Sequence, residues 1–137
     1  MNTSPLDRLH IFILAGGSGE RFWPMSRAQL PKHLLRLLGE RTLLETTARR
    51  VEGLVPWERV FVLTNTAQVD AVRRELPFVP PENILAEPAK RDTAPACALA
   101  SGLARSRDPQ AICALLPADA MIHNVPAFQR QLAEAAA

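Results

Sequence analysis

The chain has 137 residues, of which 47% are hydrophobic and 22% charged, and its formal net charge is +2. This is the size and composition of one ordinary globular domain with a substantial core. The small charge, the absence of Tyr and the lack of any apolar run of membrane-spanning or signal-peptide length argue against nucleic-acid and membrane binding and favour the cytoplasm.

Strand-like and helix-like patterns alternate along the whole chain. In chain order the predicted elements are a strand at 9–14, a helix at 42–54, a strand at 60–63, a helix at 67–76, a strand at 84–86, a helix at 94–105, a strand at 111–116 and a helix at 125–137. The predicted helix caps are Thr42 (in a capping box with Glu45), Thr66, Thr93 and Asn124, with Gly53 closing the first helix.

This alternation predicts an α/β fold, doubly wound and Rossmann-like, with a mostly parallel sheet and helices on both faces. The last helical pattern reaches Ala137 without a cap or trailing loop, which predicts a truncated domain.

A glycine-rich turn, LAGGSGER at residues 14–21, follows the first predicted strand. Backbone N–H groups in such a turn can approach an anion closely because glycine has no Cβ. Arg21 and Lys32 add positive charge, the first as a bidentate fork and the second as a point charge. The spacing fits neither a dinucleotide fingerprint nor a Walker A loop, because the required glycine positions fall on Phe22 and Arg21. We therefore predict a phosphate-binding turn of a third kind.

Two further loops are expected at the same edge of the sheet, because ligands of open α/β sheets bind outside the carboxyl ends of the strands. In EPAKRDTAP at residues 87–95, Glu87 can accept hydrogen bonds from a base and Thr93 can offer its hydroxyl, although the segment can also serve only to start a helix. Asp119 follows the fourth predicted strand, where a carboxylate either caps a turn or holds Mg²⁺ against phosphate oxygens. The three loops together favour one nucleotide site.

Other polar residues carry weaker signals. Cys97 and Cys113 are isolated and are interpreted as reduced, buried thiols. Arg27, His33 and Arg36 are interpreted as ordinary structural or surface residues.

The three segments resemble the sugar-1-phosphate nucleotidyltransferases, and among them the members that act on mannose 1-phosphate with GTP. The similar stretches are LAGGSGERFWPMSRAQLPK at 14–32, EPAKRDTAPACALA at 87–100 and LPADAMI at 116–122. Three positions depart from that pattern: Asp92 where Asn is common, Ala120 where His is common and His33 where Gln is frequent.

The resemblance implies the fold of nucleotide-diphospho-sugar transferases, with residues 1–137 as the nucleotide-binding half and the sugar-phosphate pocket elsewhere. It also implies formation of GDP-mannose and pyrophosphate from GTP and mannose 1-phosphate, with Mg²⁺ as cofactor. The implied roles are Arg21 and Lys32 as catalytic cations, Ala15, Gly16, Gly17, Ser18, Gly19, Glu87, Arg91 and Thr93 as nucleotide contacts, and Asp119 as a metal ligand.

Two alternatives stay open. One is another member of the family, such as a glucose-1-phosphate thymidylyltransferase. The other is a nucleotide-binding module without catalysis, suggested by Asp92, Ala120 and the missing half. An incomplete sheet also leaves a surface through which copies of the chain could form a homo-oligomer.

Overall fold

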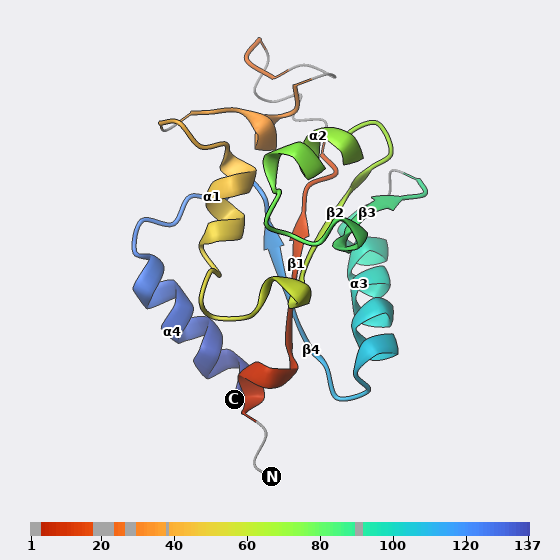
Figure 1. Cartoon of the computed structure of the whole chain (residues 1–137), viewed down its shortest axis with the longest axis vertical. Helices are drawn as coiled ribbons and strands as arrows, with labels where there is room; N and C mark the ends of the chain where they lie inside the picture. The colour runs from red at the N-terminus through yellow and green to blue at the C-terminus, as the bar shows by residue number, and fades with distance from the viewer. Residues whose placement is uncertain (1–3, 18–23, 27–29, 38, 90–91) are drawn as a thin grey trace.

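The computed structural model describes residues 4–17, 24–26, 30–37, 39–89 and 92–137. Its strands are β1 (Leu9–Leu14), β2 (Val60–Asn65), β3 (Ile84–Glu87) and β4 (Ile112–Pro117). They form one parallel sheet in the order β3-β2-β1-β4, so their carboxyl ends lie at the same edge (Figure 1). This order, with the chain returning past β1 to add β4 on its other side, is that of a doubly wound sheet. The predicted fold class is confirmed.

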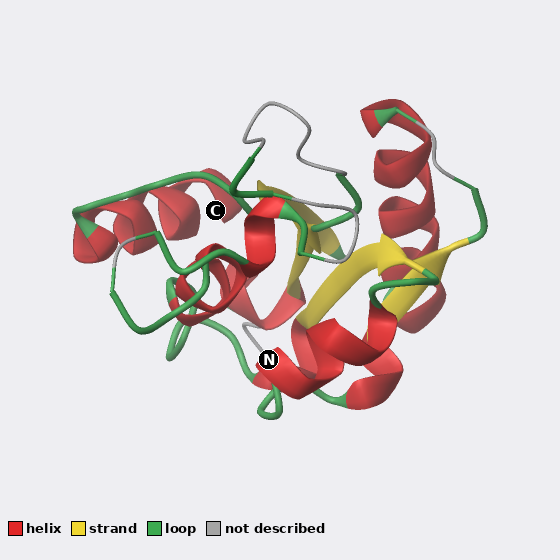
Figure 2. Ribbon diagram, turned by 90° about the horizontal axis from the view of Figure 1, so that it is seen from above, coloured by secondary structure: helices red, strands yellow, loops and turns green. Residues whose placement is uncertain are grey.

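Helices cover both faces of the sheet, as predicted. They are α1 (Leu43–Arg49), α2 (Val69–Glu75), α3 (Thr93–Arg107) and α4 (Val125–Ala136). Residues of α1, α2 and α4 pack in one hydrophobic cluster, whereas α3 packs in a second cluster on the opposite face. Seen from above, the strands run between these two layers (Figure 2).

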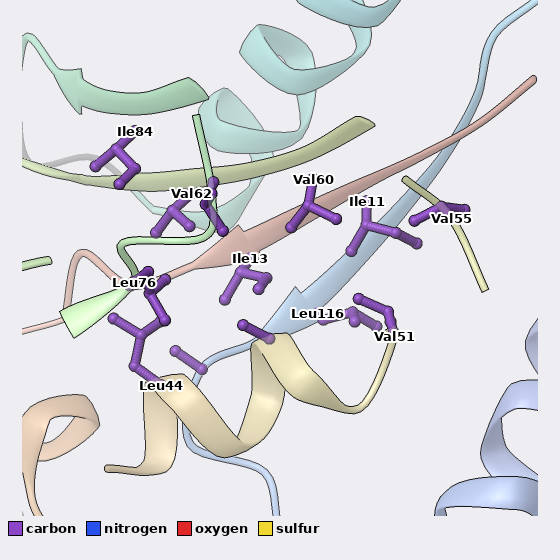
Figure 3. Packing of buried hydrophobic residues seen from close by; sticks show 14 of the residues in the cluster. Ile11, Ile13, Leu44, Val51, Val55, Val60, Val62, Leu76, Ile84 and Leu116 are labelled. Carbon is purple, nitrogen blue, oxygen red and sulfur yellow. The ribbon is translucent and has the colours of Figure 1, made fainter. Parts of the chain in front are cut away.

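Alternate residues of β1 contribute side chains to the two hydrophobic clusters. Ile11 and Ile13 are fully buried on the face that also contains Leu44 and Leu116, as Figure 3 shows. Phe12 points to the other face because successive side chains of a strand alternate. The central strand is therefore buried on both faces, which explains its continuous apolar run.

A stripe of small residues lets α3 lie close to the sheet. Ala96, Ala100 and Ala104 are buried against Phe12 and Phe61. The two rings stack with their centroids 4.7 Å apart. Packing of this kind fixes the start of α3 near the end of β3.

The predicted first helix is too long. It ends at Arg49, and the backbone then tightens, with Val51 N donating to Ala48 O at 3.2 Å. Gly53 adopts φ +78° inside the turn that follows, which Leu54 N closes by donating to Val51 O, so it belongs to that turn and does not end the helix.

Two of the predicted helix caps are confirmed and two are wrong. Thr42 accepts a hydrogen bond from Glu45 N at 3.0 Å, and Asn124 accepts one from Ala127 N at 3.0 Å. Helix α2 begins after Gln68, so the predicted cap Thr66 lies several residues before it. Thr93 is itself the first residue of α3, which Asp92 precedes. Such polar clusters offer several equivalent starting points.

Both cysteines are free, as predicted, but each is only half-buried. Cys113 lies in β4, an edge strand of the described sheet. Separately, none of the described helices is long and apolar enough to cross a membrane.

Gly102 weakens α3 without a packing reason. It lies inside the helix and is exposed, and a Cβ there would meet nothing within 4 Å. We expect Gly102→Ala to raise the free energy of unfolding by about 0.5–1 kcal/mol, because alanine loses less backbone entropy in a helix. Urea denaturation of the chain measures this. The same change at Gly39, where φ is +115°, should lower stability; equal effects at the two sites would contradict the explanation.

Candidate functional site

Gly16 lies against the side chain of Glu87. A Cβ at Gly16 would lie 2.8 Å from Oε2 of Glu87, closer than real Cβ atoms approach. The turn is held there because Ala15 N donates to Leu63 O at 2.8 Å and the Thr64 hydroxyl donates to Ala15 O at 3.0 Å. The loop after β1 and the end of β3 are thus in contact, although β2 separates the two strands in the sheet.

Lys32 and Asp119 form an ion pair that joins the loop after β1 to the loop after β4. Lys32 begins a short 3-10 turn, Lys32–Leu34. The exit from β4 is fixed by a hydrogen bond of 3.1 Å from Ala118 N to Leu14 O. The two side chains are only 17% and 30% exposed, so solvent screens their attraction less than that of a surface pair. All three loops predicted to meet at this edge are therefore connected.

A cavity of about 480 Å³ opens beside Glu87. Its lining residues are Glu87, Pro88, Ala89, Pro95 and Leu99. Burial raises the pKa of the Glu87 carboxyl. Among the described lining residues, the carboxylate of Glu87 is the one polar side chain beside apolar walls, and the cavity has the volume of a small-molecule site. It can accommodate a flat base that donates N–H groups to Glu87.

The structure places the other predicted residues less tightly. Ala15 is buried, Gly17 is exposed with open space at its Cβ position, and Thr93 is exposed at the start of α3. Four of the predicted site residues lie outside the described part of the chain: Ser18, Gly19, Arg21 and Arg91. Their roles stay predictions, and Arg27 lies outside it as well.

Asp119 is suited to a metal that completes its coordination with substrate oxygens. In the part of the chain that the structure describes, no group of three or more His, Cys, Asp or Glu side chains could hold a metal ion by itself. Mg²⁺ is commonly bound by one or two carboxylates plus phosphate oxygens and water. The half-buried carboxylate of Asp119, next to the cation of Lys32, fits such a site.

His33 is a buried residue, which agrees with the structural interpretation and not with the surface one. It is only 2% exposed, and its Nε2 atom has no hydrogen-bond partner among the described residues. Burial lowers the pKa of His33 to about 4; the neighbouring Gln68 opposes this shift and the charge of Lys32 adds to it. The ring is therefore neutral at physiological pH, next to Lys32 in the same 3-10 turn.

This burial predicts a pH-dependent stability. The unfolded chain protonates His33 near pH 6.5, whereas the folded chain does so only near pH 4. The free energy of unfolding should therefore fall as the pH drops through this window, by on the order of 3 kcal/mol in total. Below about pH 4, protonation of His33 causes no further loss of stability. We expect His33→Gln to remove this loss, as measured by urea denaturation at pH 7 and pH 4.5. His123→Gln, at an exposed position, is the control; an undiminished loss in His33→Gln would contradict the prediction.

Comparison with known families and proteins gives a consistent assignment. The family model described as nucleotidyl transferase matches residues 11–137. The chain is 40% identical over 126 residues to a mannose-1-phosphate guanylyltransferase of Escherichia coli K12, covering 89% of this chain and 26% of that protein. It is 42% identical over 127 residues to a mannose-1-phosphate guanylyltransferase of Salmonella typhimurium LT2, with coverage of 89% and 26%. The chain thus spans about a quarter of the length of these curated relatives.

A solved structure agrees with this similarity. The crystal structure described as a mannose-1-phosphate geranyltransferase from Thermus thermophilus superposes with a TM-score of 0.78 at 38% sequence identity. The match covers 93% of this chain and 37% of the other.

Proposed function

The chain belongs to the nucleotidyl transferase family, and we propose that it is the nucleotide-binding part of an enzyme that forms GDP-mannose and pyrophosphate from GTP and mannose 1-phosphate. The relatives named for this activity support the choice of substrates. The observation that carries the proposal is the Lys32–Asp119 ion pair, which sets a cation and a carboxylate between the loops after β1 and β4.

The proposed reaction is a direct displacement at phosphorus. A phosphate oxygen of mannose 1-phosphate forms a bond to the α-phosphorus of GTP. The bond from that phosphorus to the oxygen bridging to the β-phosphate breaks, and pyrophosphate leaves with the electron pair. Such transfers depend on positioning and charge neutralisation more than on covalent help from the protein.

Lys32 is proposed to neutralise the phosphates near the reacting centre. Its side chain is mostly buried and is held at the edge of the sheet by Asp119, so its charge needs little reorganisation to act there. The resemblance assigns Arg21 a similar role on the triphosphate.

Asp119 is proposed to hold Mg²⁺ together with phosphate oxygens. The ion would withdraw charge from the phosphates and orient them. Asp119 would hold the ion, and Lys32 beside it would contact a phosphate oxygen.

The nucleoside is proposed to lie beside β3. Gly16 permits close approach to Glu87, whose carboxylate would accept hydrogen bonds from the base. The turn at Ala15, Gly16, Gly17, Ser18 and Gly19 would cradle the phosphates, with Arg91 and Thr93 near the nucleoside.

The test is a substrate panel with the full-length gene product and Mg²⁺. Pyrophosphate release is measured for GTP and dTTP, each with mannose 1-phosphate and with glucose 1-phosphate. The proposal expects the fastest release with GTP and mannose 1-phosphate. Faster release with dTTP and glucose 1-phosphate would reassign the chain to a thymidylyltransferase. GTP-dependent thermal stabilisation without any release would indicate a non-catalytic nucleotide-binding module.

A further inference from the structure

Helix α1 donates hydrogen bonds to the backbone on both sides of Asp119. The Thr47 hydroxyl donates to Ala118 O at 3.4 Å, and Nη2 of Arg50 donates to Ala120 O at 2.6 Å. Thr47 and Arg50 are three residues apart, so they lie on the same side at the end of α1. The two carbonyls that flank Asp119 are therefore held by one rigid element.

Arg50 is an unusual residue in this position. It is 3% exposed, and in the described part of the chain no carboxylate forms an ion pair with it. Its Nε atom is buried without a hydrogen-bond partner among the described residues, and its guanidinium lies 5.5 Å from the centroid of the Phe128 ring. Burial lowers the pKa of the guanidinium.

Stability alone does not explain a charge buried in this way. Desolvating a charge is costly, and a well-packed apolar side chain of similar volume is often at least as stable. The strong contact that the burial provides is the short hydrogen bond to Ala120 O. Because this contact uses the backbone, it does not depend on the side chain at position 120.

Helix α4 also supports the loop that carries Asp119, through the end of α1. The side-chain amide of Gln129 in α4 donates to Arg50 O at 2.9 Å and to Glu52 O at 3.1 Å. Helix α4 thereby fixes the end of α1 from which Arg50 reaches the loop. Lys32 restrains the Asp119 carboxylate itself.

We propose that Thr47 and Arg50 are positioning residues that fix the Asp119 carboxylate for a divalent cation by clamping the carbonyls of Ala118 and Ala120. The inference rests on the proposed function, in which Asp119 binds Mg²⁺. Groups that orient a metal ligand typically change metal affinity or activity about 10- to 100-fold when they are removed. When the backbone is held on both sides of Asp119, the carboxylate can occupy fewer positions relative to the ion.

The experiment compares two variants with a matched control in the full-length gene product. Thr47→Val removes one hydroxyl at constant volume, and Arg50→Met removes the guanidinium but keeps an apolar stem. Arg49→Met is the control: the Arg49 guanidinium bonds Glu45 and lies 4.5 Å from the Phe78 ring centroid, away from the Asp119 loop. Circular dichroism checks that each variant is folded.

Three measurements separate positioning from a general structural effect. The first is the Mg²⁺ concentration that gives half-maximal pyrophosphate release, which should rise about tenfold in Arg50→Met and by less in Thr47→Val. The second is binding of Mn²⁺ to the GTP-bound protein, followed by electron paramagnetic resonance, which should weaken in the same order. GTP affinity in EDTA should stay unchanged, and Arg49→Met should match the unmodified protein in all three measurements.

The outcomes distinguish the two proposals. Folded variants with the unmodified protein's Mg²⁺ and Mn²⁺ dependence would overturn the positioning role while leaving the proposed function intact. If Arg50→Met does not fold, Arg50→Lys and Thr47→Val decide the question by the same readouts. An unmodified protein that releases no pyrophosphate would overturn the proposed function and this inference with it.

Discussion

Asp119→Asn is expected to slow pyrophosphate release by the full-length gene product about 10²- to 10³-fold while the fold is retained. An amide keeps the size of the side chain but loses the charge that attracts both Lys32 and a divalent cation. Steady-state kinetics with GTP, mannose 1-phosphate and saturating Mg²⁺ measure the effect. Because the loss concerns charge in the reacting complex, it should appear mainly in kcat.

The control for this change is Asp70→Asn in α2, whose carboxylate is 83% exposed. It removes the same charge from an exposed side chain that pairs with Arg73 and not with Lys32, and it should leave the rate unchanged. Near-normal turnover of Asp119→Asn would remove the basis for a metal at this position.

Lys32→Met is expected to slow the same reaction about 10²-fold, because it removes a preorganised positive charge from the phosphate site. Lys32→Arg should recover only part of the activity, since a planar guanidinium does not reproduce a compact ammonium. Arg36→Met, which removes an exposed cation a few residues away, is the control.

The ion pair also predicts how changes at Lys32 and Asp119 combine. If Lys32 and Asp119 act as one unit, the double variant should lose less activity than the product of the two single losses. Strictly multiplicative losses would show that the two residues act independently, against the arrangement that the structure describes.

Much of the fold could be predicted because hydrophobic periodicity and topology determine it. The first strand has the bounds expected from its apolar run, 9–14, and the parallel order follows from the alternation of strands and helices. The helix ends were less predictable. Gly53 lies in a turn just beyond α1. Thr93 is the first residue of α3 and not its cap, because several polar residues near a terminus can satisfy the same backbone groups.

The meeting of the three loops could also be predicted, because parallel strands place their carboxyl ends together. The particular contacts could not. Position 16 requires a glycine because a Cβ there would collide with Glu87. This contact lies across β2, and no spacing in the sequence reveals it. Burial of His33 depends in the same way on the tertiary packing around it.

The contacts of Thr47 and Arg50 beside Asp119 show a more general reason why site contacts could not be predicted from the sequence. Thr47 and Arg50 act on backbone carbonyls, which every residue has, so the sequence does not mark their targets. The available signal was weak: a threonine and an arginine beside the apolar stripe of α1. Such a position is more commonly a solvated edge of a helix.

The most direct test of the central claim follows both products of one reaction by ³¹P nuclear magnetic resonance. The full-length gene product is supplied with GTP, mannose 1-phosphate and Mg²⁺, and the signals of GDP-mannose and pyrophosphate are recorded over time. The account predicts that the two products appear in equal amounts and that Asp119→Asn forms neither at a comparable rate. Unchanged GTP and mannose 1-phosphate in the presence of the folded, unmodified protein would contradict it.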